Sequence, residues 1–143
     1  MAGKIKLSIQ GVKVLMSRVK QIHGGRMIKI MVVDDETAMR EILKIMLKDY
    51  KVIEACNGRE AVELYKRERP DLVLMDVMMP IMNGIDATAE IKKMDPNAKI
   101  VAITAYASSK GEKIVEAGAD FILKKPFSRK DVIGLIEKII GQV

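Results

Sequence analysis

The sequence contains one cysteine, one histidine, no tryptophan, three tyrosines and two phenylalanines in 143 residues. A single cysteine, Cys56, excludes an intrachain disulfide and a cysteine-built metal site, and the single His23 argues against a zinc site. No apolar run approaches the roughly 18 residues of a membrane span. Lys13 and Arg18 also interrupt the only stretch that could imitate a signal peptide. We therefore expect a soluble, cytoplasmic protein without membrane insertion.

Acidic residues are absent from the first 26 positions, although the whole chain has 25 basic and 19 acidic residues and a net charge of +6. Six basic residues lie there, which leaves 19 basic and 19 acidic residues from Met27 onward. We divide the chain into a basic N-terminal extension, 1–26, and a domain, 27–143. The neutral domain is expected to bind no nucleic acid. The extension is either the product of a misassigned start, with Met27 as the initiator, or a basic arm for nucleic acid or acidic partners.

Aliphatic residues are abundant, and from Met27 their spacing alternates between two periods. Five short runs rich in β-branched residues are typical of strands that are covered on both faces. The stretches between them place apolar residues at steps of three and four, as amphipathic helices do. This alternation predicts an α/β fold, a five-stranded parallel sheet of order 2-1-3-4-5 with helices on both faces. The expected strands are Ile28–Val33, Lys51–Ala55, Leu72–Met75, Lys99–Thr104 and Phe121–Leu123.

Charged and hydroxyl side chains stand at the carboxyl ends of these strands. Asp34 and Asp35 follow the first strand, and Asp76 follows the third. Thr104 ends the fourth strand, and Lys125 follows the fifth. Because sheets of this kind bind ligands at this edge, we expect one shared pocket. Carboxylates about 5 Å apart repel by roughly 3 kcal/mol per pair at an effective dielectric of about 20. The group therefore needs a cation, and oxygen ligands in an open pocket favour Mg²⁺.

Each acid taken alone has a structural alternative, since Asp commonly caps the helix that follows a strand. Asp71 starts the strand that Asp76 follows, roughly 16 Å away at about 3.3 Å per residue. We assign Asp71 a structural role. Glu36 and Asp86 are assigned to the first turns of helices, where the helix dipole favours anions.

Four motifs in order resemble the receiver domain of two-component response regulators: VVDDE, LMDVMMPIMNG, ITA and KKPF. They extend the resemblance over residues 27–143. The set is specific because Pro80 and Gly84 follow Asp76 at fixed distances, between the other motifs. The resemblance implies a flavodoxin-like receiver fold and a cis peptide bond before Pro126. The segments NGIDA and DPNAKI are similar to chemotaxis regulators of the CheY kind.

The resemblance also implies a role for each residue in the pocket. Asp76 would be the phosphoacceptor that attacks a phosphohistidine of a partner kinase, with Mg²⁺ as the cofactor. Lys125 would pair with Asp76 before transfer and with the phosphoryl group after it. Thr104 would then donate its hydroxyl to a phosphoryl oxygen and so convert the chemistry into movement of the following loop and helix. The implied metal ligands are Asp35, Asp76, the backbone carbonyl of Met78 and, largely through water, Asp34.

Three positions depart from the family pattern or modulate it. Ile122 stands where receivers usually carry Tyr or Phe, and the neighbouring Phe121 faces the opposite side of the strand. Tyr106 is an alternative moving ring or a loop residue without a role. Met78 has no group that could orient an attacking water, which predicts slow self-dephosphorylation; its alternative role is gap filling at a loop edge.

We interpret the chain as a stand-alone response regulator, with a histidine kinase and a downstream protein target as its partners, and not as an enzyme. The output surface implied by the family comprises the fourth helix, the fifth strand and the fifth helix, and we expect no DNA-binding output domain after Val143. One alternative is an intermediate receiver in a multistep phosphorelay. The other is a Mg²⁺-dependent aspartyl phosphatase, which needs two aspartates separated by one residue, whereas Asp34 and Asp35 are adjacent.

Overall fold

A five-stranded parallel sheet forms the centre of the protein, in the computed structural model that describes residues 22–105 and 109–141. Its strand order is β4-β3-β5-β6-β7, which is the predicted order 2-1-3-4-5 counted along these five strands. The predicted fold class is therefore confirmed. The strands are β3 (Lys29–Val33), β4 (Lys51–Ala55), β5 (Leu72–Asp76), β6 (Ile100–Thr104) and β7 (Phe121–Lys124).

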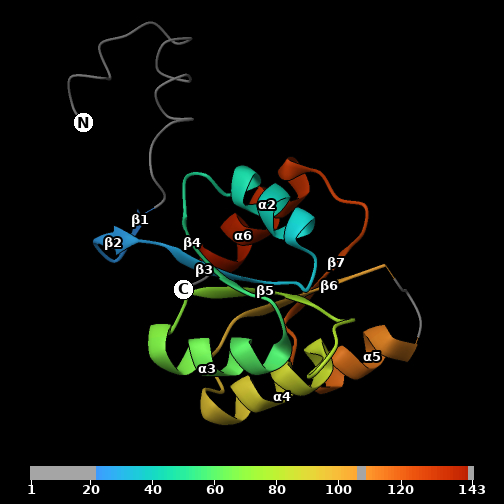
Figure 1. Ribbon diagram of the computed structural model, residues 1–143. Helices are drawn as coiled ribbons and strands as arrows, with labels where there is room; N and C mark the ends of the chain where they lie inside the picture. The colour runs from blue at the N-terminus through green and yellow to red at the C-terminus, as the bar shows by residue number, and fades with distance from the viewer. Residues whose placement is uncertain (1–21, 106–108, 142–143) are drawn as a thin grey trace, which may run out of the picture.

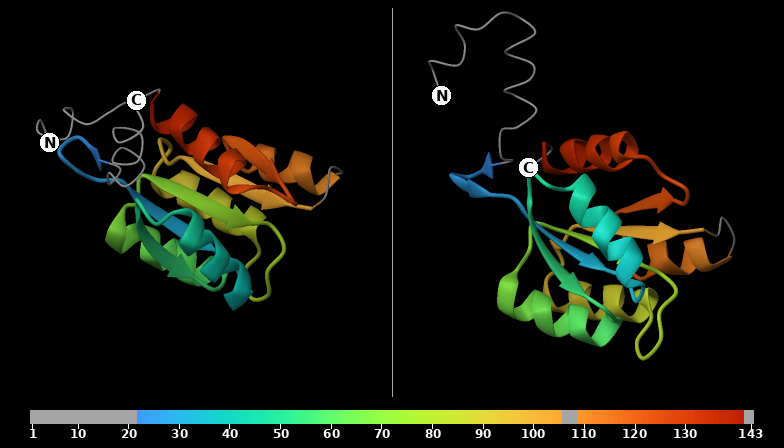
Figure 2. Two further views of the ribbon diagram at one scale, coloured as in Figure 1. Left: turned by 90° about the horizontal axis from the view of Figure 1, so that it is seen from above. Right: turned by 45° about the horizontal axis from the view of Figure 1, so that its top comes forward.

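Helices cover both faces of the sheet, with α2 and α6 on one face and α3, α4 and α5 on the other (Figures 1 and 2). Side chains alternate along each strand, so neighbouring residues enter different cores. Ile30 packs with Leu43 and Ile136 beneath α2 and α6. Met31 packs with Ile91 beneath α3 and α4. The helices are α2 (Thr37–Met46), α3 (Gly58–Glu68), α4 (Gly84–Met94), α5 (Ser109–Glu116) and α6 (Arg129–Ile140). None of the helices in the described part of the chain is long and apolar enough to cross a bilayer.

The helices that follow the strands begin where their capping residues require. Asn57, Asn83 and Ser128 accept a backbone N–H with their side chains at the starts of α3, α4 and α6. At the start of α4, a Cβ on Gly84 would overlap the backbone oxygen of Asp76. Only glycine permits this approach, which brings the start of α4 close to the end of β5.

A two-stranded antiparallel hairpin precedes the sheet and was not predicted. Its strands are β1 (Ile22–His23) and β2 (Arg26–Met27), joined by two glycines with φ of +60° and +81°. The Arg26 guanidinium donates to both carboxylate oxygens of Asp71, at 2.8 and 2.5 Å, and the Lys29 N–H donates to Asp71 at 2.8 Å. The structural role predicted for Asp71 is confirmed. Residues 1–21 of the predicted extension lie outside the described residues.

Candidate functional site

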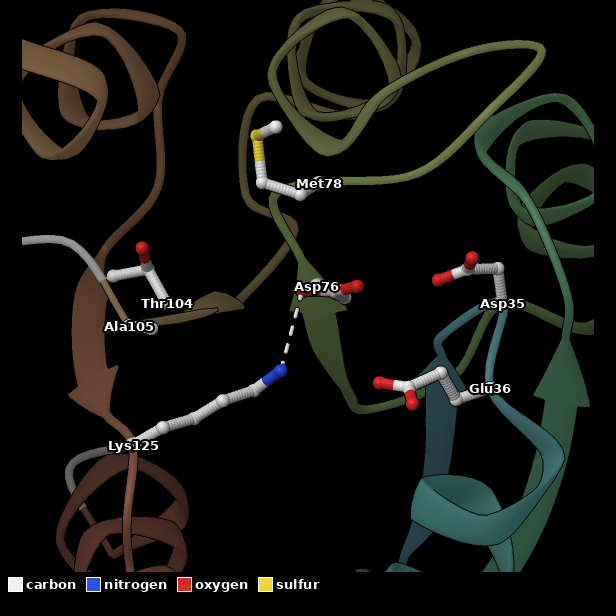
Figure 3. A pocket seen from close by; sticks show the side chains of 7 residues that line it. All are labelled: Asp35, Glu36, Asp76, Met78, Thr104, Ala105 and Lys125. Atoms are coloured by element: carbon white, nitrogen blue, oxygen red, sulfur yellow. Dashed lines mark ion pairs between the residues drawn. The ribbon is translucent and has the colours of Figure 1, made fainter.

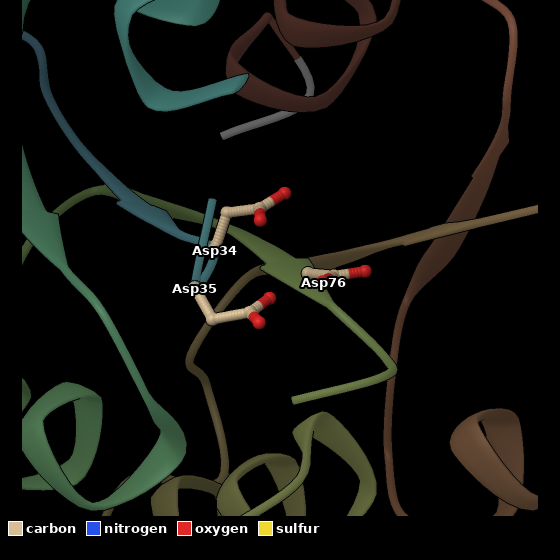
Figure 4. A group of neighbouring side chains, drawn as sticks. All are labelled: Asp34, Asp35 and Asp76. Carbon is tan, nitrogen blue, oxygen red and sulfur yellow. The ribbon is translucent and has the colours of Figure 1, made fainter. Parts of the chain in front are cut away.

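Three carboxylates meet at the carboxyl edge of the sheet. Asp34 and Asp35 follow β3, and Asp76 ends β5, which pairs with β3 through Val33 and Met75. Asp34, Asp35 and Asp76 each offer one carboxylate oxygen, and these oxygens lie within 4.8 Å of one another (Figure 4). Asp34 and Asp76 are buried, at 1% and 6% exposure, whereas Asp35 is exposed. The structure thus brings together the acids that the sequence placed at this edge.

Every polar atom of Asp34 except one carboxylate oxygen has a hydrogen-bond partner. Its N–H donates to the carbonyl of Ala55 at 3.1 Å, and its Oδ1 accepts the N–H of Glu36 at 2.9 Å. The other carboxylate oxygen, Oδ2, is buried and has no hydrogen-bond partner among the described residues. Burial raises the pKa of Asp34 above its ordinary value, although the Glu36 N–H and the charge of Lys125 oppose this effect. A buried carboxylate oxygen without a partner is costly unless a cation or a water satisfies it.

Asp76 ends β5 and faces an ammonium group. Burial raises the pKa of Asp76 to about 6, and the negative charge of Asp34 adds to this effect. Lys125 and the backbone N–H of Met78 act in the opposite direction. The Lys125 Nζ lies 3.8 Å from Asp76 Oδ1, and 25% of its side chain is exposed. Asp76 is therefore ionised at neutral pH at a free-energy cost that a bound cation would reduce.

The acids open into a pocket whose walls come from four strand ends. Thr104 ends β6 beside β5, and Lys125 follows β7 with the predicted cis peptide bond to Pro126. Figure 3 shows these side chains around a shared space, with that of Met78 extending away from Asp76. Met78 is 47% exposed at this edge. The lining residues are Asp35, Glu36, Asp76, Met78, Thr104, Ala105 and Lys125.

Glu36 lines this pocket, and its assignment to the first turn of a helix was wrong. It occupies the N-cap position of α2, makes no side-chain capping bond and directs its carboxylate into the pocket (Figure 3). The available signal was its position, because Glu36 directly follows Asp34 and Asp35 at the carboxyl end of the first strand, the edge at which such sheets bind ligands. A second residue that the sequence did not indicate is Arg40, whose Nη1 donates to the backbone carbonyl of Asp34 at 2.7 Å.

The proposed switch positions have different surroundings. Phe121 packs against the core beneath α2 and α6, with its ring centroid 5.9 Å from Lys138 Nζ. The prediction that Phe121 faces away from the side of Ile122 agrees with this packing. Ile122 is 39% exposed on β7. Tyr106 lies outside the described residues.

A sequence profile described as the response regulator receiver domain matches residues 30–137, which includes all five strands of the sheet except Lys29, and the whole pocket. The chain belongs to the response regulator receiver family. Receivers of this family bind Mg²⁺ in an acidic pocket and are phosphorylated in a Mg²⁺-dependent reaction, and they act with histidine kinases and downstream targets.

The relatives include chemotaxis regulators and a receiver with bound magnesium. The chemotaxis proteins CheY of Halobacterium salinarum and Thermotoga maritima are 44% and 45% identical over 115 residues, covering 78% of this chain and 96% of each relative. The receiver domain of the sensor histidine kinase PA1611 from Pseudomonas aeruginosa superimposes with a TM-score of 0.75 at 30% identity, covering 79% of this chain and 97% of that one. That structure has a magnesium ion coordinated in its active-site cleft. This chain is thus a receiver homologous to CheY.

Proposed function

We propose that this receiver accepts a phosphoryl group on Asp76 from a histidine kinase, with Mg²⁺ as the cofactor, and that it acts as a stand-alone chemotaxis regulator in the cytoplasm. The observation that carries the proposal is the position of Asp76. Its carboxylate lies at the sheet edge beside Asp34 and Asp35 and 3.8 Å from the Lys125 ammonium. The chemotaxis assignment is supported by two CheY relatives that match over almost their whole length.

The acidic residues fit a hard divalent cation. Three carboxylate oxygens lie within 4.8 Å of one another, and one oxygen of Asp34 is buried without a partner among the described residues. Asp35, Asp76 and the backbone carbonyl of Met78 would hold the ion directly, and Asp34 would act largely through water. When bound, Mg²⁺ neutralises charge on the transferring phosphoryl oxygens.

In the transfer, an oxygen of Asp76 attacks the phosphorus of a phosphohistidine. The P–O bond to Asp76 forms, the P–N bond breaks, and its electron pair remains on the departing imidazole. Lys125 releases its pairing with Asp76 and binds a phosphoryl oxygen, so that its ammonium stabilises the negative charge of the transferred phosphoryl group. The products are an acyl phosphate on this chain and a free histidine on the kinase, which makes the receiver a phosphoacceptor with intrinsic phosphotransfer activity.

The phosphoryl group then changes the surface of the receiver. Thr104 ends β6, and α5 is the next helix, so a hydroxyl bond to a phosphoryl oxygen would displace the end of β6 and, through it, α5. The target would bind across α5, β7 and α6, where Ile122 takes the place of an aromatic switch. Tyr106, which lies outside the described residues, is the alternative ring that the sequence offers. Slow hydrolysis of the acyl phosphate, which Met78 does not assist, would return the receiver to its resting form.

Incubation with acetyl phosphate or phosphoramidate tests the proposal. Intact-mass spectrometry should show addition of one phosphoryl group to the wild type in the presence of Mg²⁺, and EDTA should prevent it. Asp76→Asn should stay unmodified, because its amide cannot form the acyl phosphate. Equal modification of the wild type and Asp76→Asn would reject Asp76 as the acceptor. Turnover of a general phosphate ester would instead favour the aspartyl phosphatase.

A further inference from the structure

The Arg40 guanidinium connects three elements directly behind the acidic cluster. Its Nη1 donates to the backbone carbonyl of Asp34 at 2.7 Å, and its Nε donates to Glu54 Oε1 on β4 at 3.0 Å. Its Nη2 donates to Thr37 Oγ1 in the first turn of α2 at 3.3 Å. Only 15% of the Arg40 side chain is exposed. The planar guanidinium can make these bonds together because its donors have fixed directions.

These bonds complete the fixation of Asp34. Its N–H is bonded to Ala55, its carbonyl to Arg40, and its Oδ1 to the Glu36 N–H. The remaining polar atom is Oδ2, which is buried and has no partner among the described residues. A small rotation of the peptide after Asp34 would move both Asp34 and Asp35, because they are consecutive. The bond from Arg40 opposes that rotation.

We infer that Arg40 is a positioning residue for the divalent-metal site, which it stabilises by holding the Asp34 carbonyl. The inference rests on the proposed function, because it requires that the acidic cluster bind Mg²⁺. It also predicts a change in Mg²⁺ affinity in the direction opposite to the effect of charge alone. A positive charge near the cluster repels a divalent cation, so loss of that charge alone would strengthen Mg²⁺ binding. Loss of positioning would weaken it, and groups that orient metal ligands in this way typically contribute 10- to 100-fold in affinity.

Calorimetric titration of Mg²⁺ into the unphosphorylated full chain tests the inference. In Arg40→Gln the Kd for Mg²⁺ should rise about ten-fold or more, against the direction expected from charge. Phosphorylation by acetyl phosphate should recover towards the wild-type rate at saturating Mg²⁺, because Arg40 does not touch the reacting atoms. This recovery would not occur if the substitution damaged the acceptor itself. Circular dichroism confirms that each variant is folded during the titration.

Lys44→Gln is the matched control. Lys44 lies on the same helix and also binds Glu54, with its Nζ 3.1 Å from Oε2, and its replacement changes the charge by the same amount. The Kd of Lys44→Gln for Mg²⁺ should remain near that of the wild type or fall slightly. Arg40→Lys provides a second test if Arg40→Gln is unstable, since an ammonium retains the charge without the fork of donors. It too should bind Mg²⁺ more weakly than the wild type.

The outcomes separate the inference from the proposed function. Wild-type or tighter Mg²⁺ binding in folded Arg40→Gln or Arg40→Lys would overturn the role of Arg40 while the metal site stands. Equal weakening in Arg40→Gln and Lys44→Gln would also overturn it, because the effect would then belong to Glu54. A wild type that binds no Mg²⁺ would overturn the proposed function and the inference with it.

Discussion

Replacing Asp76 with Asn should stabilise the metal-free protein at neutral pH. Burial and the charge of Asp34 raise the pKa of Asp76 from 3.8 to about 6, so ionisation of Asp76 costs more free energy in the folded state than in the unfolded state. At about 1.4 kcal/mol for each tenfold change in the proton equilibrium, this shift corresponds to about 3 kcal/mol. Asp76 is only 6% exposed, so solvent screens little of this cost. The asparagine side chain has a similar shape without the charge, and the free energy of unfolding should rise by up to about 3 kcal/mol.

The pH dependence of this gain has a definite sign. Because the pKa of Asp76 is raised in the folded state, the unfolded chain releases the proton first as pH rises. The wild type should therefore lose stability relative to Asp76→Asn between about pH 4 and pH 6, with a constant difference above that range. Below about pH 4 the carboxyl group is protonated in both states and the gain should disappear. Urea unfolding in EDTA, followed by far-UV circular dichroism because the chain has no tryptophan, measures the difference.

Two controls identify the electrostatic origin of the effect. Asp86 is exposed in the first turn of α4, so Asp86→Asn should lose a favourable helix-dipole interaction and destabilise the protein by about 0.3–1 kcal/mol. Saturating Mg²⁺ should stabilise the wild type and narrow its difference from Asp76→Asn. A difference that is equal at pH 4 and pH 7, or a less stable Asn variant at pH 7, would refute the reasoning.

Three further substitutions test the surroundings of the pocket. Met78→Asn should shorten the lifetime of the acyl phosphate, since an amide can orient an attacking water; equal decay rates in Mg²⁺ would remove the argument. Gly84→Ala should lower the free energy of unfolding by about 1–3 kcal/mol in urea and slow phosphorylation, because its Cβ would collide with the Asp76 carbonyl. Ile81 has a φ of 70° and is 79% exposed, so Ile81→Asn should raise the free energy of unfolding in urea by about 1 kcal/mol, whereas no gain would show that the backbone there is unstrained.

The pocket residues could be predicted because their positions depend on the sheet alone. Asp34, Asp76 and Thr104 stand at the ends of apolar runs, and the carboxyl ends of parallel strands meet at one edge. Strand alternation likewise predicted that Phe121 and Ile122 face opposite sides of the fifth strand, and Phe121 packs on the core beneath α2 and α6. None of these inferences depends on the orientation of a helix about its own axis. The periodicity of a single segment does not determine that orientation.

The residues that the sequence did not reveal depend on that rotation or on contacts between distant segments. Arg40 reaches the Asp34 carbonyl because α2 is oriented so that this side chain lies between the end of β3 and Glu54 on β4. Its position among outward-facing charged residues of an amphipathic helix gave no indication of this contact. The bond between Arg26 and Asp71 links residues 45 apart in sequence, and it determines where the hairpin meets the domain. Local spacing contains no information about such a pair.

The reduced stability of the metal-free receiver and the reactivity that we propose for Asp76 have one physical cause. Burying Asp34 and Asp76 side by side raises the pKa of both carboxyl groups, and the ionised cluster therefore has a high free energy until cations approach it. Lys125 supplies part of that charge from the end of β7, at 3.8 Å from Asp76. A phosphoryl group on Asp76 would add negative charge at the same point and compete for the same ammonium. If Asp76 is the acceptor, we therefore expect phosphorylation to act first on the ends of β6 and β7, which bear Thr104 and Lys125.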